Sequence, residues 1–164
     1  MKSLMIAAAT AALTVVAVPA VSQAQEVYGT VGYGNVDTDT GKLGALQARL
    51  GYRFTPYVGV EGEASFGVKD DNFGGVDIKL KDQVGAYVVG FLPVTPKAEL
   101  FARLGYSAAT FDTSLGNRDA DGVAYGVGAQ YHVTDKDGVR FDWTRHDYDA
   151  GNADVYALSY TRKF

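Results

Sequence analysis

Apolar and polar residues alternate with a two-residue period over most of the chain. In residues 46–54, Leu46, Leu50 and Phe54 lie on one side of an extended strand, and Arg49 and Arg53 lie on the other. Because successive side chains of a β-strand point to opposite faces, this period predicts strands with two different faces. The same criterion predicts seven more strands, at residues 27–36, 58–68, 78–92, 98–109, 123–133, 139–148 and 153–164. The strand 78–92 is the most ambiguous, because both of its faces become apolar near residues 87–91.

The predicted connections alternate between tight turns and longer polar loops. The tight turns are residues 55–57, 93–97 and 134–138, and the mostly longer loops are residues 37–43, 69–77, 111–121 and 149–152. Strands of about ten residues with short turns at one end are typical of bacterial membrane barrels, whose short turns lie in the periplasm. The sequence therefore predicts an all-β fold, an eight-stranded antiparallel up-and-down β-barrel.

Period two alone does not say which face of the barrel meets water, because a soluble barrel has its apolar face inside. Here the polar face mixes charged residues with Gly, Ala and Ser, as expected where space is limited. The apolar face carries Tyr, Phe and Trp toward the strand ends, as expected at membrane interfaces. We therefore interpret the fold as a transmembrane barrel with its polar face inside. A soluble exported barrel that binds a small ligand is the alternative if the faces are reversed.

The first residues have the pattern of an export signal. Lys2 precedes an apolar stretch over residues 4–18, and Ala24 ends a short Ser-Gln-Ala sequence that fits a cleavage site. The apolar stretch is shorter than the roughly 20 residues that a membrane-spanning helix needs. We expect residues 1–24 to be a cleaved signal peptide and residues 25–164 to form the barrel domain.

Composition excludes several classes of function. The chain has 164 residues, no cysteine and a formal net charge of −4, so it has no disulfides and no basic surplus for nucleic acid. Its two histidines, His132 and His146, lie on separate predicted strands without a nearby serine, which predicts neither a catalytic triad nor a metal site. Asp37, Asp39 and Gly41 do not fit a calcium loop. We therefore expect no enzyme activity, no cofactor and no bound metal.

Antiparallel pairing predicts which charged residues meet inside the barrel, because residues opposite one another share a face. A three-residue turn at 55–57 sets Arg49 opposite Glu63 and brings Arg53 diagonal to Glu61. These four residues are predicted to form a ladder of ion pairs in the lumen. Five more charged side chains are predicted to point inward: Lys79, Lys81, Glu99, Arg103 and Arg140.

The turn at 134–138 is predicted to contain five residues. That length sets Tyr131 opposite Phe141 on the outside of the barrel. It also predicts two pairs on the inside, Gln130 with Asp142 and His132 with Arg140.

The export signal, the eight alternating strands and the C-terminal segment together resemble the outer-membrane β-barrel family related to the OmpA barrel domain and OmpX. The resemblance covers the whole mature chain. Its most specific element is the last strand, because such barrels end in an aromatic residue preceded by apolar residues at alternate positions, a signal read by the barrel assembly machinery. The residues that match this C-terminal assembly signal are Tyr156, Leu158, Tyr160 and Phe164. Arg162 departs from it, since that position is usually apolar or aromatic.

The resemblance implies a protein of the cell outer membrane with a polar, ion-paired interior and no continuous wide pore. Small barrels of this family serve structural, surface-contact or undefined roles, so we expect a non-enzymatic barrel with a structural or surface-contact role. A narrow channel for ions or small solutes is the alternative, and the soluble ligand-binding barrel is the third. The expected partners are outer-membrane lipid, lipopolysaccharide and, during biogenesis, the barrel assembly machinery. The protein is expected to be a monomer that binds no nucleic acid.

Overall fold

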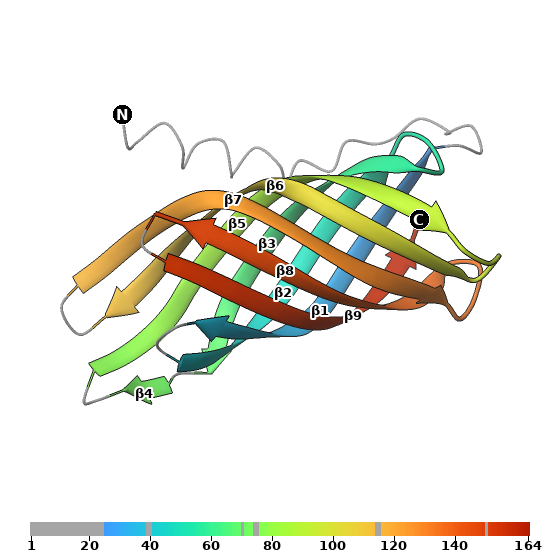
Figure 1. The fold of residues 1–164 in the computed structure, drawn as a ribbon. Coiled ribbons are helices and arrows are strands. Elements are labelled where there is room, and N and C mark those ends of the chain that lie inside the picture. Colours follow the sequence, from blue (N-terminus) through green and yellow to red (C-terminus); the bar gives the residue numbers. More distant parts are fainter. Residues whose placement is uncertain (1–24, 39–40, 70, 74–75, 114–115, 150) are drawn as a thin grey trace.

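The computed structural model describes residues 25–38, 41–69, 71–73, 76–113, 116–149 and 151–164. These residues form nine strands: β1 (Glu26–Thr38), β2 (Gly41–Arg53), β3 (Val58–Lys69), β4 (Asp71–Phe73), β5 (Val76–Pro93), β6 (Ala98–Thr113), β7 (Gly116–His132), β8 (Asp137–Tyr148) and β9 (Gly151–Lys163). Pairing of β1 with β9 and of β3 with β5 closes all of them except the short β4 into a barrel (Figure 1). The predicted fold class, an eight-stranded antiparallel up-and-down barrel, is confirmed. The predicted signal peptide, residues 1–24, lies outside the described residues.

Several strands continue into segments that the sequence predicts as loops. β6 and β7 remain paired as far as Thr113 and Gly116, so the predicted loop 111–121 is largely strand, and β1 and β2 do the same around the predicted loop 37–43. Apolar and polar residues do not alternate in these segments, so a two-residue period does not mark them as strands. The prediction of long loops at this end was therefore wrong.

Three tight turns at the other end of the barrel share one construction. The Oγ1 atoms of Thr55, Thr95 and Thr134 each accept hydrogen bonds from the backbone amides two and three residues further on, at 2.9–3.3 Å. The amide of Val133 donates to the carbonyl of Asp137 at 2.9 Å, which closes the last of these turns around three residues. The threonine hydroxyls therefore fix the turn length at three.

The register between β7 and β8 differs from the predicted one because the turn contains three residues and not five. Gln130 lies opposite Arg140 and Tyr131 lies opposite Val139. The predicted pairs were therefore wrong by two residues: Tyr131 with Phe141, Gln130 with Asp142, and His132 with Arg140. A shift of two residues keeps every side chain on its predicted face.

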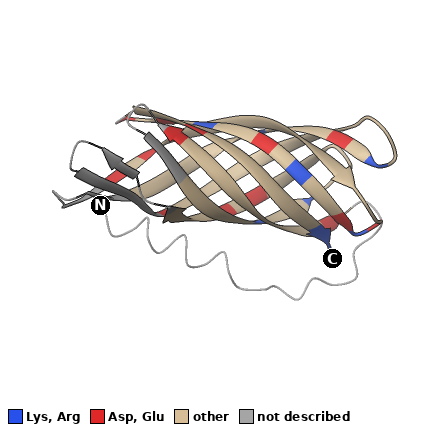
Figure 2. Cartoon of the chain, turned by 90° about the horizontal axis from the view of Figure 1, so that it is seen from below, with Lys and Arg blue, Asp and Glu red and all other residues tan. Residues whose placement is uncertain are grey.

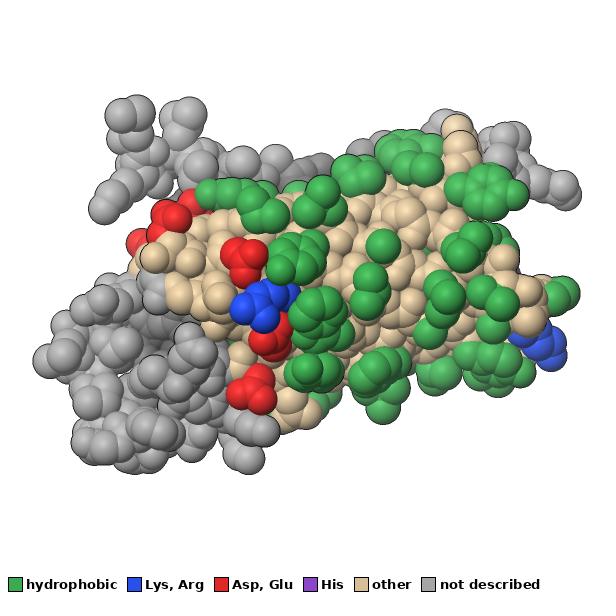
Figure 3. Space-filling view, viewed as in Figure 1, with side chains coloured by type: hydrophobic (Ala, Val, Ile, Leu, Met, Phe, Trp, Pro, Cys, Tyr) green, Lys and Arg blue, Asp and Glu red, His purple; other side chains and the backbone are tan. Residues whose placement is uncertain are grey.

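Apolar side chains cover the outside of the barrel, and charged and polar side chains lie inside together with two apolar clusters. Leu104 and Leu158 are 60% and 65% exposed on the outer wall, whereas Arg103 and Arg140 are 2% and 0% exposed inside. Hydrophobic side chains spread over the wall (Figure 3), and charged residues of both signs lie along the strands (Figure 2). This is the reverse of a soluble barrel and fits a wall surrounded by hydrocarbon. The described residues include no helix long and apolar enough to cross a membrane.

The strand β5, whose faces are ambiguous in sequence, points aromatic side chains into the barrel. Tyr87, Val89 and Phe91 are buried inside, whereas Val88 and Leu92 are exposed on the wall. Both faces are apolar at this height because the lumen here holds an aromatic layer.

Candidate functional site

A network of six charged side chains fills the middle of the lumen. Its members come from strands β2, β3, β6 and β8, and all are at least 95% buried. They are Arg49, Arg103 and Arg140 with Glu61, Glu63 and Asp142. Three positive and three negative charges leave this central network neutral.

Arg49 connects opposite sides of the barrel. It lies across from Glu63 in the register of β2 and β3, and its Nε is 2.7 Å from Glu63 Oε2. The two terminal nitrogens of the same guanidinium donate to both oxygens of Asp142 on β8, at 2.7 and 2.9 Å. Arg49 therefore uses all of its fork, the geometry in which arginine binds carboxylates most strongly.

The other two arginines complete the network. Arg140 donates from both terminal nitrogens to Glu61, at 2.5 and 3.2 Å. Arg103 Nη2 is 2.8 Å from Glu63 Oε2. The hydroxyl of Tyr28 also donates to Glu61, at 2.6 Å. Each buried carboxylate of β3 is thus held by an arginine and a second donor, which is what a charge removed from water requires.

An aromatic layer lies between this central network and the turn end of the lumen. On β6 the inward-facing residues run Glu99, Phe101 and Arg103, so Phe101 separates the two charged levels. Phe91 lies beside it with ring centroids 6.3 Å apart, and Tyr28 meets Phe91 edge to face at 6.1 Å. We call Tyr28, Phe91 and Phe101 the aromatic layer.

Glycines in the wall make room for these rings. A side-chain carbon built on Gly51 would lie 2.1 Å from Cζ of Tyr28, and one on Gly128 would lie 2.4 Å from Cζ of Phe101. Gly51 occupies the inward position of β2 between Arg49 and the next arginine, so the Tyr28 ring takes the space that a side chain would fill.

Arg53 belongs to a separate pair at the turn end. Its two terminal nitrogens bind Glu99 on β6 at 2.7 and 3.1 Å, and its guanidinium lies 3.7 Å from the centre of the Phe91 ring. The predicted contact of Arg53 with Glu61 is therefore wrong. Glu61 instead accepts a hydrogen bond from the Tyr28 hydroxyl, and the aromatic layer lies between Glu61 and the Arg53–Glu99 pair. His132 faces the same pair, 3.4 Å from Glu99.

A histidine and a serine meet above the central network, contrary to the expectation that no serine lies near a histidine. Ser107 Oγ on β6 is 2.9 Å from Nδ1 of His146 on β8. The two side chains reach each other across Gly122 and Ala124 of the intervening β7. The other ring nitrogen faces the amide of Gln83 at 3.5 Å, so no carboxylate orients the ring as in a catalytic triad.

Comparison with known proteins identifies the family. Residues 8–164 match the sequence profile described as "Outer membrane protein beta-barrel domain". The chain belongs to this family. No curated protein sequence matches the chain. The resemblance to outer-membrane barrels is thus confirmed.

Several solved structures share the fold of this outer-membrane barrel. Ail, the attachment invasion locus protein of Yersinia pestis, solved with the heparin analogue sucrose octasulfate, has a TM-score of 0.62 and 20% identity over 87% of this chain and 100% of that chain. The N-terminal barrel domain of OprF from Pseudomonas aeruginosa has a TM-score of 0.66 and 11% identity over 87% of this chain and 100% of that chain. OprG from Pseudomonas aeruginosa has a TM-score of 0.64 and 14% identity over 86% and 96%. At these identities the likeness shows the fold alone.

Family membership supports an outer-membrane location. The family consists of outer-membrane barrels and not of enzymes in general. Among the residues that the structure describes, no group of three or more His, Cys, Asp or Glu could hold a metal ion. The described lumen of this outer-membrane barrel is lined by ion pairs and packed aromatic rings.

The last strand of the outer-membrane barrel presents its predicted assembly signal on the outer wall. The four residues are 47–74% exposed: Tyr156, Leu158, Tyr160 and Phe164. The amide of Phe164 donates to Val27 of β1 at 2.9 Å, where β1 and β9 meet. Arg162 also faces outward and pairs with Asp137 at 3.0 Å. The side chains of Lys79 and Lys81, predicted to point inward, lie outside those that the structure describes.

Proposed function

We propose that the protein is a structural barrel of the outer membrane whose lumen does not conduct ions. The observation that carries this proposal is the neutral central network, in which three arginines and three carboxylates bind one another across the lumen. An ion that entered would have to displace one of these paired charges from its partner. Breaking a buried pair costs about 3–5 kcal/mol, which opposes permeation.

The aromatic layer adds a second barrier. Phe91 and Phe101 lie in the lumen between the central network and the Arg53–Glu99 pair, and the guanidinium groups of Arg53 and Arg140 lie against their rings. Arg140 lies 3.8 Å from the centre of the Phe101 ring. Apolar rings therefore take up part of the lumen at this level, beside the polar side chains of Gln130 and His132.

A surface-contact role fits the end opposite the tight turns. β5, β6 and β7 contain 18, 16 and 17 residues, more than the roughly 9–11 that cross a membrane, so this part of the sheet projects beyond the wall (Figure 1). Ail was solved with a heparin analogue. The described outer positions of this chain at the same end carry one arginine, Arg145, which pairs with Asp147 and Asp154, and a surplus of acidic side chains: Asp119, Asp121, Asp147, Asp149 and Asp154. We therefore propose contacts with neutral or basic surfaces and not with polyanions.

Export and assembly complete the proposal. The basic Lys2, the apolar stretch over residues 4–18 and the Ser-Gln-Ala sequence that ends at Ala24 support removal of residues 1–24. The exposed row from Tyr156 to Phe164 supports recognition of the last strand by the barrel assembly machinery. We propose a monomer surrounded by outer-membrane lipid and lipopolysaccharide.

Planar bilayers test the closed lumen directly. The purified barrel should give conductance near the background of protein-free membranes, while a heat-dependent shift on gels shows that the inserted protein is folded. Steady ion-selective steps from folded wild-type protein would contradict the proposal and favour the narrow channel.

A further inference from the structure

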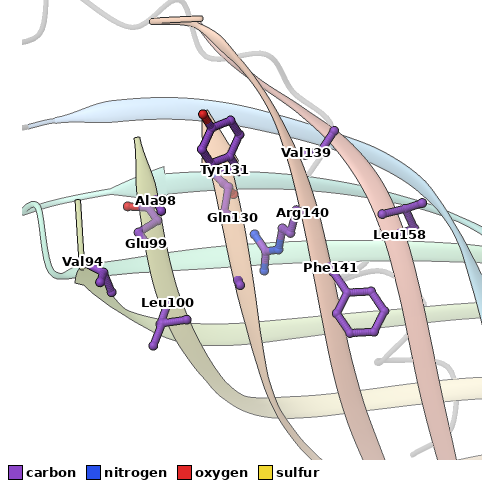
Figure 4. Close-up of a pocket in the computed structure, with 11 residues that line it drawn as sticks. Val94, Ala98, Glu99, Leu100, Gln130, Tyr131, Val139, Arg140, Phe141 and Leu158 are labelled. Carbon is purple, nitrogen blue, oxygen red and sulfur yellow. The ribbon is translucent and has the colours of Figure 1, made fainter. Parts of the chain in front are cut away.

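A groove of about 400 Å³ lies on the outer wall near the tight turns (Figure 4). It runs across β6, β7, β8 and β9. Its side chains are apolar, and the main ones are Leu100, Ala129, Tyr131, Val139, Phe141 and Leu158. The volume is in the range of small-molecule sites, which run from about 300 to 1,000 Å³.

The register explains why the wall is hollow at this place. Ala129 on β7 lies directly between Leu100 on β6 and Phe141 on β8, and Phe141 in turn faces Leu158 on β9. A single methyl group thus forms the floor between two large side chains. The walls of the groove are about half exposed, so they are available to a molecule in the surrounding membrane.

Positive charge stands at the turn end of the same four strands. Lys97 and Lys136 are exposed in the two turns that border the groove. The carbonyl of Lys97 accepts a hydrogen bond from His132 at the end of β7, and that of Lys136 accepts one from Lys163 at the end of β9. Asp135 lies in the same turns, and Asp137, which follows Lys136, pairs with Arg162 at 3.0 Å, so these five residues together carry one net positive charge. The third tight turn, Thr-Pro-Tyr at 55–57, has no charge.

An apolar groove with cationic groups at its interfacial end matches the chemistry of a membrane lipid that carries a phosphate. Because the tight turns of such barrels lie in the periplasm, this end meets the periplasmic leaflet. We infer that the groove holds one acyl chain of a glycerophospholipid from that leaflet, with its phosphate near Lys97 and Lys136. The inference rests on the proposed membrane-spanning function.

Retention of lipid by the purified protein tests this site. The full barrel, purified in detergent and mixed with phosphatidylglycerol, is examined by native mass spectrometry. Wild type should keep one lipid, and Ala129→Leu, which fills the floor, should lower the retained fraction at least tenfold. Ala48→Leu is the matched control, since Ala48 is an exposed alanine of the outer wall on β2, outside the groove.

A second variant tests the headgroup without altering the wall. Lys97→Gln combined with Lys136→Gln should reduce retention of phosphatidylglycerol to that of diacylglycerol with the same chains, which lacks the phosphate. Equal retention by wild type and Ala129→Leu, or equal loss in Ala48→Leu, would overturn the groove as a site and indicate unspecific lipid. If the folded wild type inserts in vesicles but retains no lipid, the groove fails while the proposed function stands. If it does not insert at all, the proposed function fails.

Discussion

At the scale of single residues, the stability of the lumen depends on mutual neutralisation of its buried charges more than on any one contact. Glu63 accepts hydrogen bonds from Arg49 and Arg103, and from Tyr87 and Gln83 at 3.3 Å. A buried ion pair gains little over an apolar pair of the same shape, but loss of one partner leaves a charge that water cannot reach. The network is therefore sensitive to changes that break its neutrality.

Glu63→Gln should destabilise the barrel by about 3–5 kcal/mol, because Arg49 and Arg103 then share one negative charge fewer. Urea unfolding in lipid vesicles measures the loss. Arg145→Gln is the control, since this outer arginine pairs with Asp147 at 33% and 45% side-chain exposure and should cost about 0–1 kcal/mol. Arg49→Gln combined with Glu63→Gln should regain part of the loss. Strict additivity in this double-mutant cycle would show that the two side chains do not interact.

Gly51→Ala tests the fit of the aromatic layer against the wall. The added carbon meets the Tyr28 ring at 2.1 Å, so the ring must move away from Glu61, and we expect a loss of about 1–3 kcal/mol. Gly62→Ala, at a glycine with nothing within 4 Å, should change stability little. Equal stability of both variants in the same urea titration would mean that Tyr28 does not fill the space at Gly51.

At the scale of the strand, what matters is the depth of each outward side chain in the membrane. Leu104→Arg should cost about 2–4 kcal/mol near the bilayer midplane, whereas Val94→Arg, beside a tight turn, should cost about 0–1 kcal/mol. Both side chains are 60% exposed on the wall, so burial in the protein is matched. Refolding yield and urea midpoints in vesicles measure the difference. Equal tolerance of both would mean that the wall does not lie in hydrocarbon.

The two-residue period predicts the face of each side chain well but not its partner across the lumen. Arg49, Glu61 and Glu63 lie inside, and alternation along β2 and β3 is sufficient to predict that. The contact of Arg49 with Asp142 joins residues that are 93 positions apart, and it depends on how far the strands tilt when the barrel closes. No local pattern contains that information.

The length of the turns and the side-chain contacts in the lumen were not predicted from the sequence, for different reasons. The predicted β7–β8 register is wrong by two residues because the backbone hydrogen bonds that Thr134 accepts within its turn were not included in the prediction. A threonine stands at the same place in all three turns. Ser107 and His146 meet across Gly122 and Ala124, two small residues that look unimportant in sequence. A cluster formed across an intervening strand cannot be read from either strand alone.

At the scale of the whole molecule, the orientation of the barrel is open to a simple test. The chain has no cysteine, so single cysteines introduced at Asn152, or at Pro56, Thr95 and Lys136, report only their own position. Intact cells should be labelled by an impermeant maleimide at Asn152 and not at the other three, which lie in the tight turns. The opposite labelling would reverse the orientation.

The connections of the central network also bear on how the barrel enters a membrane. Arg49 with Asp142 and Arg140 with Glu61 join residues 93 and 79 positions apart, so neither pair exists before the sheet closes. A half-formed sheet in hydrocarbon would present Arg140 without Glu61 and Asp142 without Arg49, and each charge that lacks its partner costs several kcal/mol in lipid. Partly inserted intermediates are therefore disfavoured. Membrane insertion and barrel closure should occur as one cooperative event, and refolding followed by tryptophan fluorescence and by heat-resistant gel mobility should give the same rate constant.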